Sequence, residues 1–308
     1  MENWKSEKDE WNEVILDAVI GISNTNETSI QIKLKEADTA WMYAKEHRLS
    51  YKFYDESMDQ EKTHKNNFLW IKKVRKALEE ERVFVQFQAI QNNQTQKIEK
   101  YEALVRIHET DGTIVPPGMF LPTITESKLY VDLTYRIIEK VCFLLNDFSQ
   151  ECSININAEH LIDFNLSEVI LKHVNKYKIR NRLVVEILES EKIENYGIVL
   201  EKLNLLKSQG VKIAIDDFGT GYSNFEHIIK LPIDYIKIDG SLIKNIHKDK
   251  VSKTLVKNIV NICNTLKIKT IAEFVHCKEV QDIVLFLGVD YSQGYYIGKP
   301  TETPWKAK

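Results

Sequence analysis

Acidic side chains recur at or near the ends of short apolar segments of this 308-residue sequence. Glu186 lies within VVEIL, Asp216 and Asp217 end VKIAIDD, and Glu273 ends IKTIAE. Carboxylates that converge repel one another unless cations neutralise them, so such a cluster implies bound metal. Oxygen ligands favour Mg2+ or Mn2+, with Ca2+ as an inhibitory substitute. Because two such ions can activate water and stabilise an in-line displacement, the residues predict phosphodiester hydrolysis.

Polar residues also alternate with branched apolar ones within the expected strands. In CSININ, Asn155 and Asn157 alternate with isoleucines, and in YIKID, Lys237 and Asp239 do the same. Alternate residues of a strand face opposite sides, so the isoleucines can pack beneath helices while the polar side chains face inward. A single acid at a strand end is more often a helix cap or part of a surface ion pair. Several on successive strands make a shared site the better interpretation.

The elements that must position these residues are short strands with amphipathic helices between most of them, a pattern typical of a parallel sheet covered by helices. Eight strands are expected, at residues 83–90, 98–107, 152–157, 183–188, 211–217, 235–239, 268–273 and 291–297. The linker 91–96 is too short for a parallel crossover, so the first two strands should form an antiparallel hairpin. The predicted fold is α/β, a modified TIM (β/α)8 barrel with one antiparallel strand. Its active site should lie at the C-terminal ends of the strands.

The chain is long enough for one barrel of roughly 250 residues plus an extension, or for two ordinary domains. Residues 57–80 have apolar residues at helical spacing among lysines and glutamates, which predicts a connecting helix. Residues 1–56 contain a short βαβ-like piece that is too small to bury a core alone. We therefore expect an N-terminal fragment at 1–56, a connecting helix at 57–80 and the barrel at 81–308.

Composition limits the classes of partner. The net charge of -3 gives no broad attraction to nucleic acid, so we expect no DNA or RNA duplex as a partner. The four cysteines show no CxxC pair, and the eight histidines form no HExxH motif, so disulfides and zinc hydrolysis have little support. No apolar run approaches the roughly 18 residues of a membrane span. We expect a cytoplasmic protein, or the cytoplasmic part of a longer sensor protein.

An ordered set of motifs then points to a family. YEALVR at residues 101–106 closely resembles the signature of EAL domains, and SININ, VEILES, DDFGTGYSN, IKID, AEFVH and SQGYY follow it in the family's order. The resemblance covers roughly residues 68–300. It implies hydrolysis of cyclic di-GMP to linear pGpG with two Mg2+ or Mn2+ ions, and a homodimer formed near the loop after the paired aspartates.

Position by position, the resemblance also implies a set of metal ligands. Glu102, Asn155, Glu186 and Asp216 resemble the ligands of one ion, with Asp216 bridging to the second. Asp217 resembles the main ligand of the second ion. None of these positions departs from the family pattern.

Further positions resemble catalytic residues. Lys237 resembles the residue that holds the attacking water, and Glu273 resembles the second-site acid and a candidate base, with the choice between them for the proton left open. The same resemblance implies that Asp239 would support the ions or the substrate and that Gln293 would assist in the same site. Glu189 resembles the acid that holds the loop following the paired aspartates.

Three positions resemble those that hold the dinucleotide. Gln88 would lie near a base or the sugar-phosphate edge, Arg106 would bind a phosphate oxygen, and Leu104 lies between Arg106 and Glu102 on the same expected strand. Ala89, Leu188, Asn224, Phe274 and His276 depart from the family pattern. At His276 an acid that would tune the neighbouring lysine becomes an imidazole, which could alter the rate or the pH response.

The N-terminal piece resembles the last strand, helix and strand of a GGDEF domain, through IGIS, ADTAWMYAKE and KFYD. The signature loop of that domain is absent, so a cyclase is not supported. Two other functions remain open for the whole chain. One is a catalytically silent cyclic di-GMP receptor or scaffold, which would bind without turnover. The other is a phosphodiesterase for another nucleotide or RNA, which the near-neutral charge disfavours.

Overall fold

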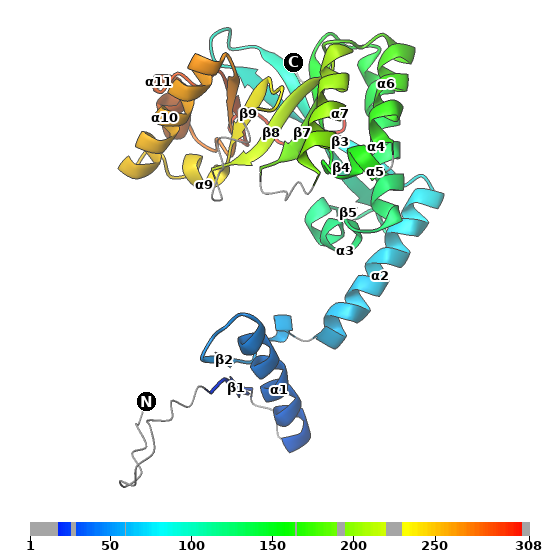
Figure 1. Cartoon of the computed structure of the whole chain (residues 1–308), viewed down its shortest axis with the longest axis vertical. Helices are drawn as coiled ribbons and strands as arrows, with labels where there is room; N and C mark the ends of the chain where they lie inside the picture. The colour runs from blue at the N-terminus through cyan, green and yellow to red at the C-terminus, as the bar shows by residue number, and fades with distance from the viewer. Residues whose placement is uncertain are drawn as a thin grey trace. The chain divides into compact units, whose positions relative to one another are not determined.

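The computed structural model describes residues 18–25, 29–58, 60–163, 165–189, 195–219 and 230–303 (Figure 1). The described residues up to Trp70 form one compact unit, and those from Ile71 onward form a second. Among the described residues, no helix combines the length and the apolar character needed to cross a membrane.

The N-terminal unit is a small parallel βαβ arrangement, as the sequence predicted. Strand β1 (Ile20–Ile22) pairs in parallel with β2 (Tyr51–Phe53), and α1 (Ile30–Glu46) connects them. Gly21 lets the helix approach closely, because a Cβ there would lie 2.0 Å from the Ala37 carbonyl oxygen. A 3-10 turn, η1 (Glu56–Met58), precedes the long helix α2 (Gln60–Glu79).

The second unit is built on a closed barrel of eight strands. In order around the barrel they are β3 (Val83–Asn92), β4 (Ile98–His108), β6 (Glu151–Asn155), β7 (Leu183–Leu188), β8 (Lys212–Phe218), β9 (Tyr235–Ile238), β10 (Lys269–Ala272) and β11 (Tyr291–Gln293). Strand β3 runs antiparallel to both of its neighbours, and the other pairings around the barrel are parallel. The predicted antiparallel hairpin and the modified TIM barrel are thus confirmed. A short strand, β5 (Ile114–Val115), adds to β4 outside the closed barrel.

Helices cover the outside of the barrel (Figure 1). Among the described residues, the helices of this unit after β5 are η2 (Pro117–Met119), α3 (Leu121–Ile124), α4 (Lys128–Leu145), α5 (His160–Asp163), α6 (Leu166–Tyr177), α7 (Tyr196–Ser208), α9 (Gly240–Ile243), α10 (Lys250–Leu266) and α11 (Lys278–Phe286). The main core lies between strands and helices. Ile154, Ile236 and Ile238, predicted to pack beneath helices, are buried there with Val141 of α4 and Val256 of α10.

The last strand is shorter than the sequence suggested. A strand was expected at 291–297, but β11 ends at Gln293. Gly294 follows with φ 154°, and a Cβ there would lie 2.1 Å from the Val275 carbonyl oxygen. The Ile297 N–H donates to the Gly294 carbonyl, so the chain turns where a longer strand was expected.

A polar network closes the N-terminal end of the barrel, where strands β6, β8 and β9 begin. The Glu151 carboxylate lies 2.7 Å from Lys100 Nζ and 2.6 Å from Lys212 Nζ, and it accepts a 2.9 Å hydrogen bond from the Tyr235 hydroxyl. Lys100 is buried and also donates to the Tyr235 hydroxyl. Each charge therefore has an opposite partner within hydrogen-bonding distance.

Replacing Glu151 with Gln should lower the free energy of unfolding by about 3 kcal/mol at neutral pH, because it leaves the buried Lys100 ammonium without a counter-charge. Denaturant titration measures the change. The matched control is Glu80→Gln, which removes an exposed carboxylate paired with Arg82 and should change stability little. Equal effects of the two substitutions would contradict the assignment of this network to stability.

The loss of stability caused by Glu151→Gln should depend on pH. Burial raises the pKa of Glu151, but the charges and hydrogen bonds of Lys100 and Lys212 outweigh burial and hold the pKa below its usual range. A lowered folded-state pKa stabilises the fold above the unfolded value, and that stabilisation is lost as pH falls through the folded value. The advantage of the unaltered chain over Glu151→Gln should therefore shrink below about pH 4. An advantage that stays constant to lower pH would show that Glu151 is not the titrating group.

Candidate active site

A single buried lysine lies at the centre of the acidic residues at the other end of the barrel. Lys237, on β9, has a side chain only 1% exposed. Its Nζ lies close to four carboxylates, at 2.8 Å from Glu186 Oε2, 2.9 Å from Glu273 Oε1, 3.0 Å from Asp216 Oδ1 and 3.3 Å from Glu102 Oε2. The alternation of IKID therefore directs this side chain into the barrel, where β4, β7, β8 and β10 bring the acids to it.

The cluster carries more negative charge than Lys237 balances. Four carboxylates face one ammonium, so three negative charges remain if all four acids are ionised. Two groups have ligand oxygens within 4.8 Å of one another, namely Glu102 with Glu186 and Asp216, and Asp216 with Asp217 and Glu273. Asp216 belongs to both groups. Buried carboxylates at this density call for cations, and an all-oxygen set suits hard divalent ions.

Burial and mutual repulsion set the pKa values of the acids. Burial raises the pKa of Glu186 to about 8 and raises the pKa of Glu273 well above its usual range, although Lys237 opposes both shifts. For Glu102, burial also raises the pKa, but the Lys237 charge and hydrogen bonds from amides outweigh it and lower the pKa overall. The acids therefore differ in how readily they hold a proton.

Amide side chains orient Glu102. Asn155, at the end of β6, donates to Glu102 Oε1 at 2.9 Å, and Gln293, at the end of β11, donates to Glu102 Oε2 at 2.6 Å. The Gln293 amide also donates to Gln88 Oε1 at 3.3 Å, and Gln88 in turn donates to the Gly298 carbonyl. Gln88 is opposite Glu102 in the β3–β4 pairing. The antiparallel strand thus brings a predicted substrate residue against a predicted metal ligand.

Asp216 and Asp217 are consecutive, yet both face the cluster. Consecutive residues of a regular strand point to opposite faces. Here the β8–β9 register shifts between Ile215 and Phe218, and Asp217 has φ 54°. This bulge directs both carboxylates to the same side, and the Asp217 N–H donates to Asp216 Oδ1 at 2.9 Å. Burial, then repulsion by Asp216 and Asp239, raises the pKa of Asp217.

Two other predicted residues act through the backbone. Glu189 Oε2 accepts a 2.8 Å hydrogen bond from the Gly219 N–H, at the start of the loop after the paired aspartates. Most of that loop, residues 220–229, lies outside the described residues, as does the departure at Asn224. Asp239 caps α9, accepting from the Ser241 N–H at 2.8 Å.

The other predicted substrate residues lie along β4. Leu104 and Arg106 are half-buried and follow Glu102 at intervals of two, on the same face of the strand. Arg106 Nε donates to Gln86 Oε1 at 2.9 Å. Gln86 was missed by the sequence analysis. Its spacing of two from Gln88 on the same strand was the signal that could have found it.

The departures at Phe274 and His276 lie on the surface. Both side chains are exposed, and His276 Nδ1 lies 3.2 Å from the Phe274 carbonyl oxygen. Among the described residues, the ion-pair partners of Lys237 are the four acids above, and His276 is not one of them, so no ion pair there would let His276 tune that lysine.

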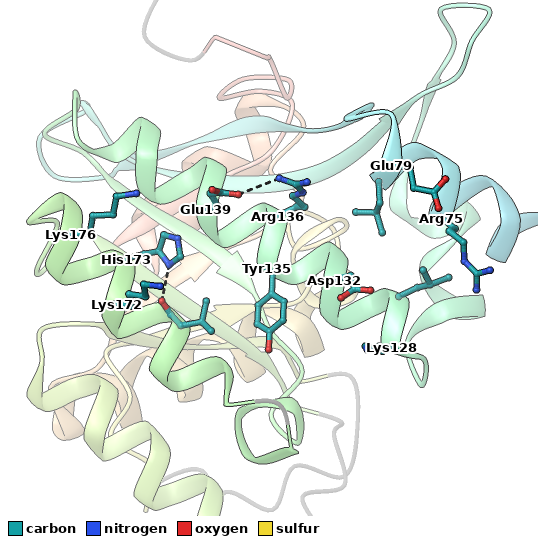
Figure 2. A pocket seen from close by; sticks show the side chains of 13 residues that line it. Arg75, Glu79, Lys128, Asp132, Tyr135, Arg136, Glu139, Lys172, His173 and Lys176 are labelled. Atoms are coloured by element: carbon teal, nitrogen blue, oxygen red, sulfur yellow. Dashed lines mark hydrogen bonds and ion pairs between the residues drawn. The ribbon is translucent and has the colours of Figure 1, made fainter.

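A separate groove of about 840 Å³ lies on the outside of the barrel, lined by α2, α4 and α6. Figure 2 shows α4 between the other two helices. The lining of the groove mixes cations such as Lys172 and Lys176 with acids such as Glu79 and Asp132. None of the predicted site residues belongs to this lining. The acidic cluster in the barrel is therefore the candidate active site.

Comparisons with known proteins identify the family of the chain. A family model described as the EAL domain matches residues 71–300. The cyclic di-GMP phosphodiesterase PdeB of Shewanella oneidensis is 32% identical over 275 residues, which cover 87% of this chain and 32% of that protein. The cyclic di-GMP phosphodiesterase PdeA of Borreliella burgdorferi is 29% identical over 300 residues, covering 93% and 44%. The chain thus spans less than half the length of these relatives.

A solved structure shows the same barrel. The PaMucR phosphodiesterase in complex with c-di-GMP superposes with a TM-score of 0.71 at 26% identity. The similarity covers 77% of this chain and 99% of that one.

Replacing Lys237 with Met should lower the free energy of unfolding by about 3 kcal/mol or more at neutral pH in chelator, because buried carboxylates lose their only cationic partner among the described residues. Adding Glu102→Gln should recover part of this loss, since a neutral amide replaces the acid of the cluster whose pKa is lowered. Chemical denaturation measures both variants, with Lys278→Met, at an exposed ion pair, as the control. Strictly additive losses would contradict the electrostatic account.

Proposed function

The chain belongs to the EAL domain family, and from this premise we propose that it hydrolyses cyclic di-GMP to linear pGpG in a metal-dependent reaction. The observation that carries the proposal is the buried acidic cluster around Lys237, with Asp216 shared between two potential metal groups. Relatives named cyclic di-GMP phosphodiesterases match most of this chain, which supports the choice of substrate.

The residues present fit two divalent ions. Glu102, Asn155, Glu186 and Asp216 would hold the first, while Asp217 and Glu273 would share Asp216 with the second, and Asp239 lies close enough to influence Asp217. The ions we propose are Mg2+ or Mn2+, with Ca2+ binding in their place without supporting turnover. When bound, such ions neutralise charge on the phosphodiester and lower the pKa of a bound water.

We propose different roles for Lys237 and Glu273, whose charged atoms lie 2.9 Å apart. Burial lowers the pKa of Lys237, but four surrounding carboxylates outweigh it and raise the pKa well above its usual range. A charged ammonium has no lone pair, so Lys237 can orient the attacking water only as a hydrogen-bond donor. Glu273 can accept a proton, and its raised pKa supports the role of general base.

The substrate side of the site is formed by β3 and β4. We propose that Arg106 binds a phosphate oxygen, that Gln88 contacts a base or the sugar-phosphate edge, and that Leu104 gives apolar contact between them. Gln293 orients both Gln88 and Glu102, so it couples substrate contact to the metal ligands. Glu189 positions the loop after the aspartates through Gly219.

We further propose a cytoplasmic homodimer. The four cysteines are free thiols, in keeping with a reducing compartment. On α10, Val251, Leu255, Ile262 and Leu266 are exposed. Their spacing places them along one side of the helix, which supports an apolar contact with a second copy.

The first experiment is chromatography of cyclic di-GMP incubated with the purified chain in Mg2+, Mn2+, Ca2+ or chelator. We expect pGpG only with Mg2+ or Mn2+.

Asp216→Ala should reduce kcat by about a thousandfold or more, because the ions contribute several kcal/mol to the stabilisation of the transition state. The chain's fold can be checked by its thermal unfolding. Tight binding without product would indicate a receptor, and preference for another nucleotide would indicate a different substrate.

Light scattering tests the homodimer. Leu255→Glu should convert a dimer to a monomer, because it places a charge in the apolar contact. Leu205→Glu, at a similarly exposed leucine on α7, should leave the dimer intact. A monomer at all concentrations of the unaltered chain would contradict this part of the proposal.

A further inference from the structure

Arg106 is a half-buried cation whose charge no neighbouring acid neutralises. It lies on β4, four residues beyond Glu102, and forms no ion pair among the described residues. Burial lowers the pKa of Arg106, and the charges of Tyr295 and Glu102 oppose that shift. A guanidinium remains protonated at neutral pH in proteins. The position therefore keeps a positive charge that an anionic ligand can meet.

Two hydrogen bonds fix the orientation of this guanidinium. Arg106 Nε donates to Gln86 Oε1 at 2.9 Å, and Nη1 donates to the Val105 carbonyl at 2.8 Å. Because the group is planar, two bonds from different nitrogens set the direction of the third nitrogen. Among the described residues, that third nitrogen, Nη2, has no hydrogen-bond partner. Its N–H groups are thus available to a ligand oxygen.

The strand pairing places Gln86 where it can reach Arg106. Gln86 is half-buried on β3 and lies opposite Leu104, one pair beyond the pairing of Gln88 with Glu102. Residues two apart on a strand share a face, so Gln86 faces the same side as Gln88. Arg106 is its diagonal neighbour across the two strands, and long side chains span that separation. The contact is therefore fixed by the register of the antiparallel hairpin.

The amide of Gln86 orients the guanidinium without cancelling its charge. A guanidinium only donates hydrogen bonds, so the amide oxygen must face Arg106 and the amide nitrogen must face away. A carboxylate at this position would accept the same bond from Nε. It would also neutralise the cation and repel a phosphate. A neutral acceptor is thus the side chain that combines a fixed orientation with full positive charge.

We propose that Gln86 is a positioning residue that holds Arg106 with its Nη2 edge toward a phosphate oxygen of the dinucleotide. The inference rests on the proposed function, in which Arg106 binds a phosphate. Bonds between a guanidinium and a phosphate are charge-assisted and directional, so a guanidinium that turns away binds the phosphate less well. Gln86 acts through Arg106 and does not touch the substrate.

Gln86→Met tests the role of the amide oxygen, because methionine keeps the length of the side chain and lacks a strong acceptor. Calorimetry with cyclic di-GMP in Ca2+ should give a Kd about tenfold higher than that of the unaltered chain. The matched control is Gln91→Met, further along β3, where the amide donates to the exposed Gln96. It should leave Kd unchanged. Thermal unfolding checks the fold of both variants, and an unchanged Kd in folded Gln86→Met would overturn the inference.

A double variant separates positioning from direct contact. Arg106→Met should raise Kd more than Gln86→Met does, since it removes the charge itself. Adding Gln86→Met to Arg106→Met should raise Kd no further, because the group that Gln86 positions is gone. A further tenfold rise would show that Gln86 contacts the ligand and would overturn its assignment as a positioning residue.

Metal binding separates positioning from a general disturbance of the site. Among the described residues, the Gln86 side chain bonds to Arg106 and to none of the acids around Lys237. Calorimetry with Mn2+ alone should therefore give the same Kd for Gln86→Met and for the unaltered chain. Weaker Mn2+ binding in Gln86→Met would assign Gln86 to the structure of the acidic cluster and overturn the inference.

Gln86→Glu separates orientation from charge. The NMR resonance of the Arg106 Nε–H, identified by its loss in Arg106→Lys, should stay protected from exchange in Gln86→Glu and lose protection in Gln86→Met. Kd for cyclic di-GMP should nevertheless rise in both variants, because the carboxylate neutralises the cation. An unaltered Kd in Gln86→Glu would overturn the role of the neutral amide.

These measurements do not require turnover, so they distinguish this inference from the proposed hydrolysis. Binding by the unaltered chain that weakens in Gln86→Met, without any product, would overturn the hydrolase and support the inference. Normal hydrolysis with the same kcat/KM in Gln86→Met would overturn the inference and support the hydrolase. No binding of cyclic di-GMP by the unaltered chain would overturn both.

Discussion

The buried ion cluster around Lys237 is the constraint on which the rest of the barrel depends. Four carboxylates approach one ammonium within 3.3 Å, in a place where little water can screen them. Ionised groups at such distances in a low-dielectric interior interact by several kcal/mol, so small displacements change the balance strongly. The strands of the barrel hold the four carboxylates and Lys237 at these distances.

Two irregularities in the barrel adapt it to this cluster. The antiparallel strand β3 places Gln88 opposite Glu102, where a parallel strand would have needed a crossover helix. The bulge at Asp216 and Asp217 turns two consecutive acids to the same side. In a regular strand one of the two would have faced the helices, where a buried carboxylate has no cation to balance it. The irregular backbone is therefore what permits the paired acids.

Much of this arrangement could be predicted from the sequence because it follows from periodicity and chain length. The alternation in CSININ and IKID predicted that Asn155 and Lys237 face the inside of the barrel. The six-residue linker at 91–96 predicted the antiparallel hairpin. The bulge could not be predicted, since its φ values depend on packing between β8 and β9. The contact between Arg106 and Gln86 depends on register across two strands, and the early end of β11 depends on Val275. These contacts depend on how separate segments pack together, although the spacing of Gln86 from Gln88 could have marked Gln86 as facing the same side of β3.

The two ends of the barrel use the same kinds of side chain with opposite charge balance. At the N-terminal end, Glu151 lies between Lys100 and Lys212, so the carboxylate has a cation on each oxygen. At the other end, Lys237 is shared by four acids, which is more negative charge than one ammonium can balance when all four are ionised. A network built only for stability has no reason to leave buried charge uncompensated, because each unpaired charge costs several kcal/mol. The excess of acid therefore distinguishes the end proposed to bind cations from the end that stabilises the fold, although both are polar and both include residues of β4, β8 and β9.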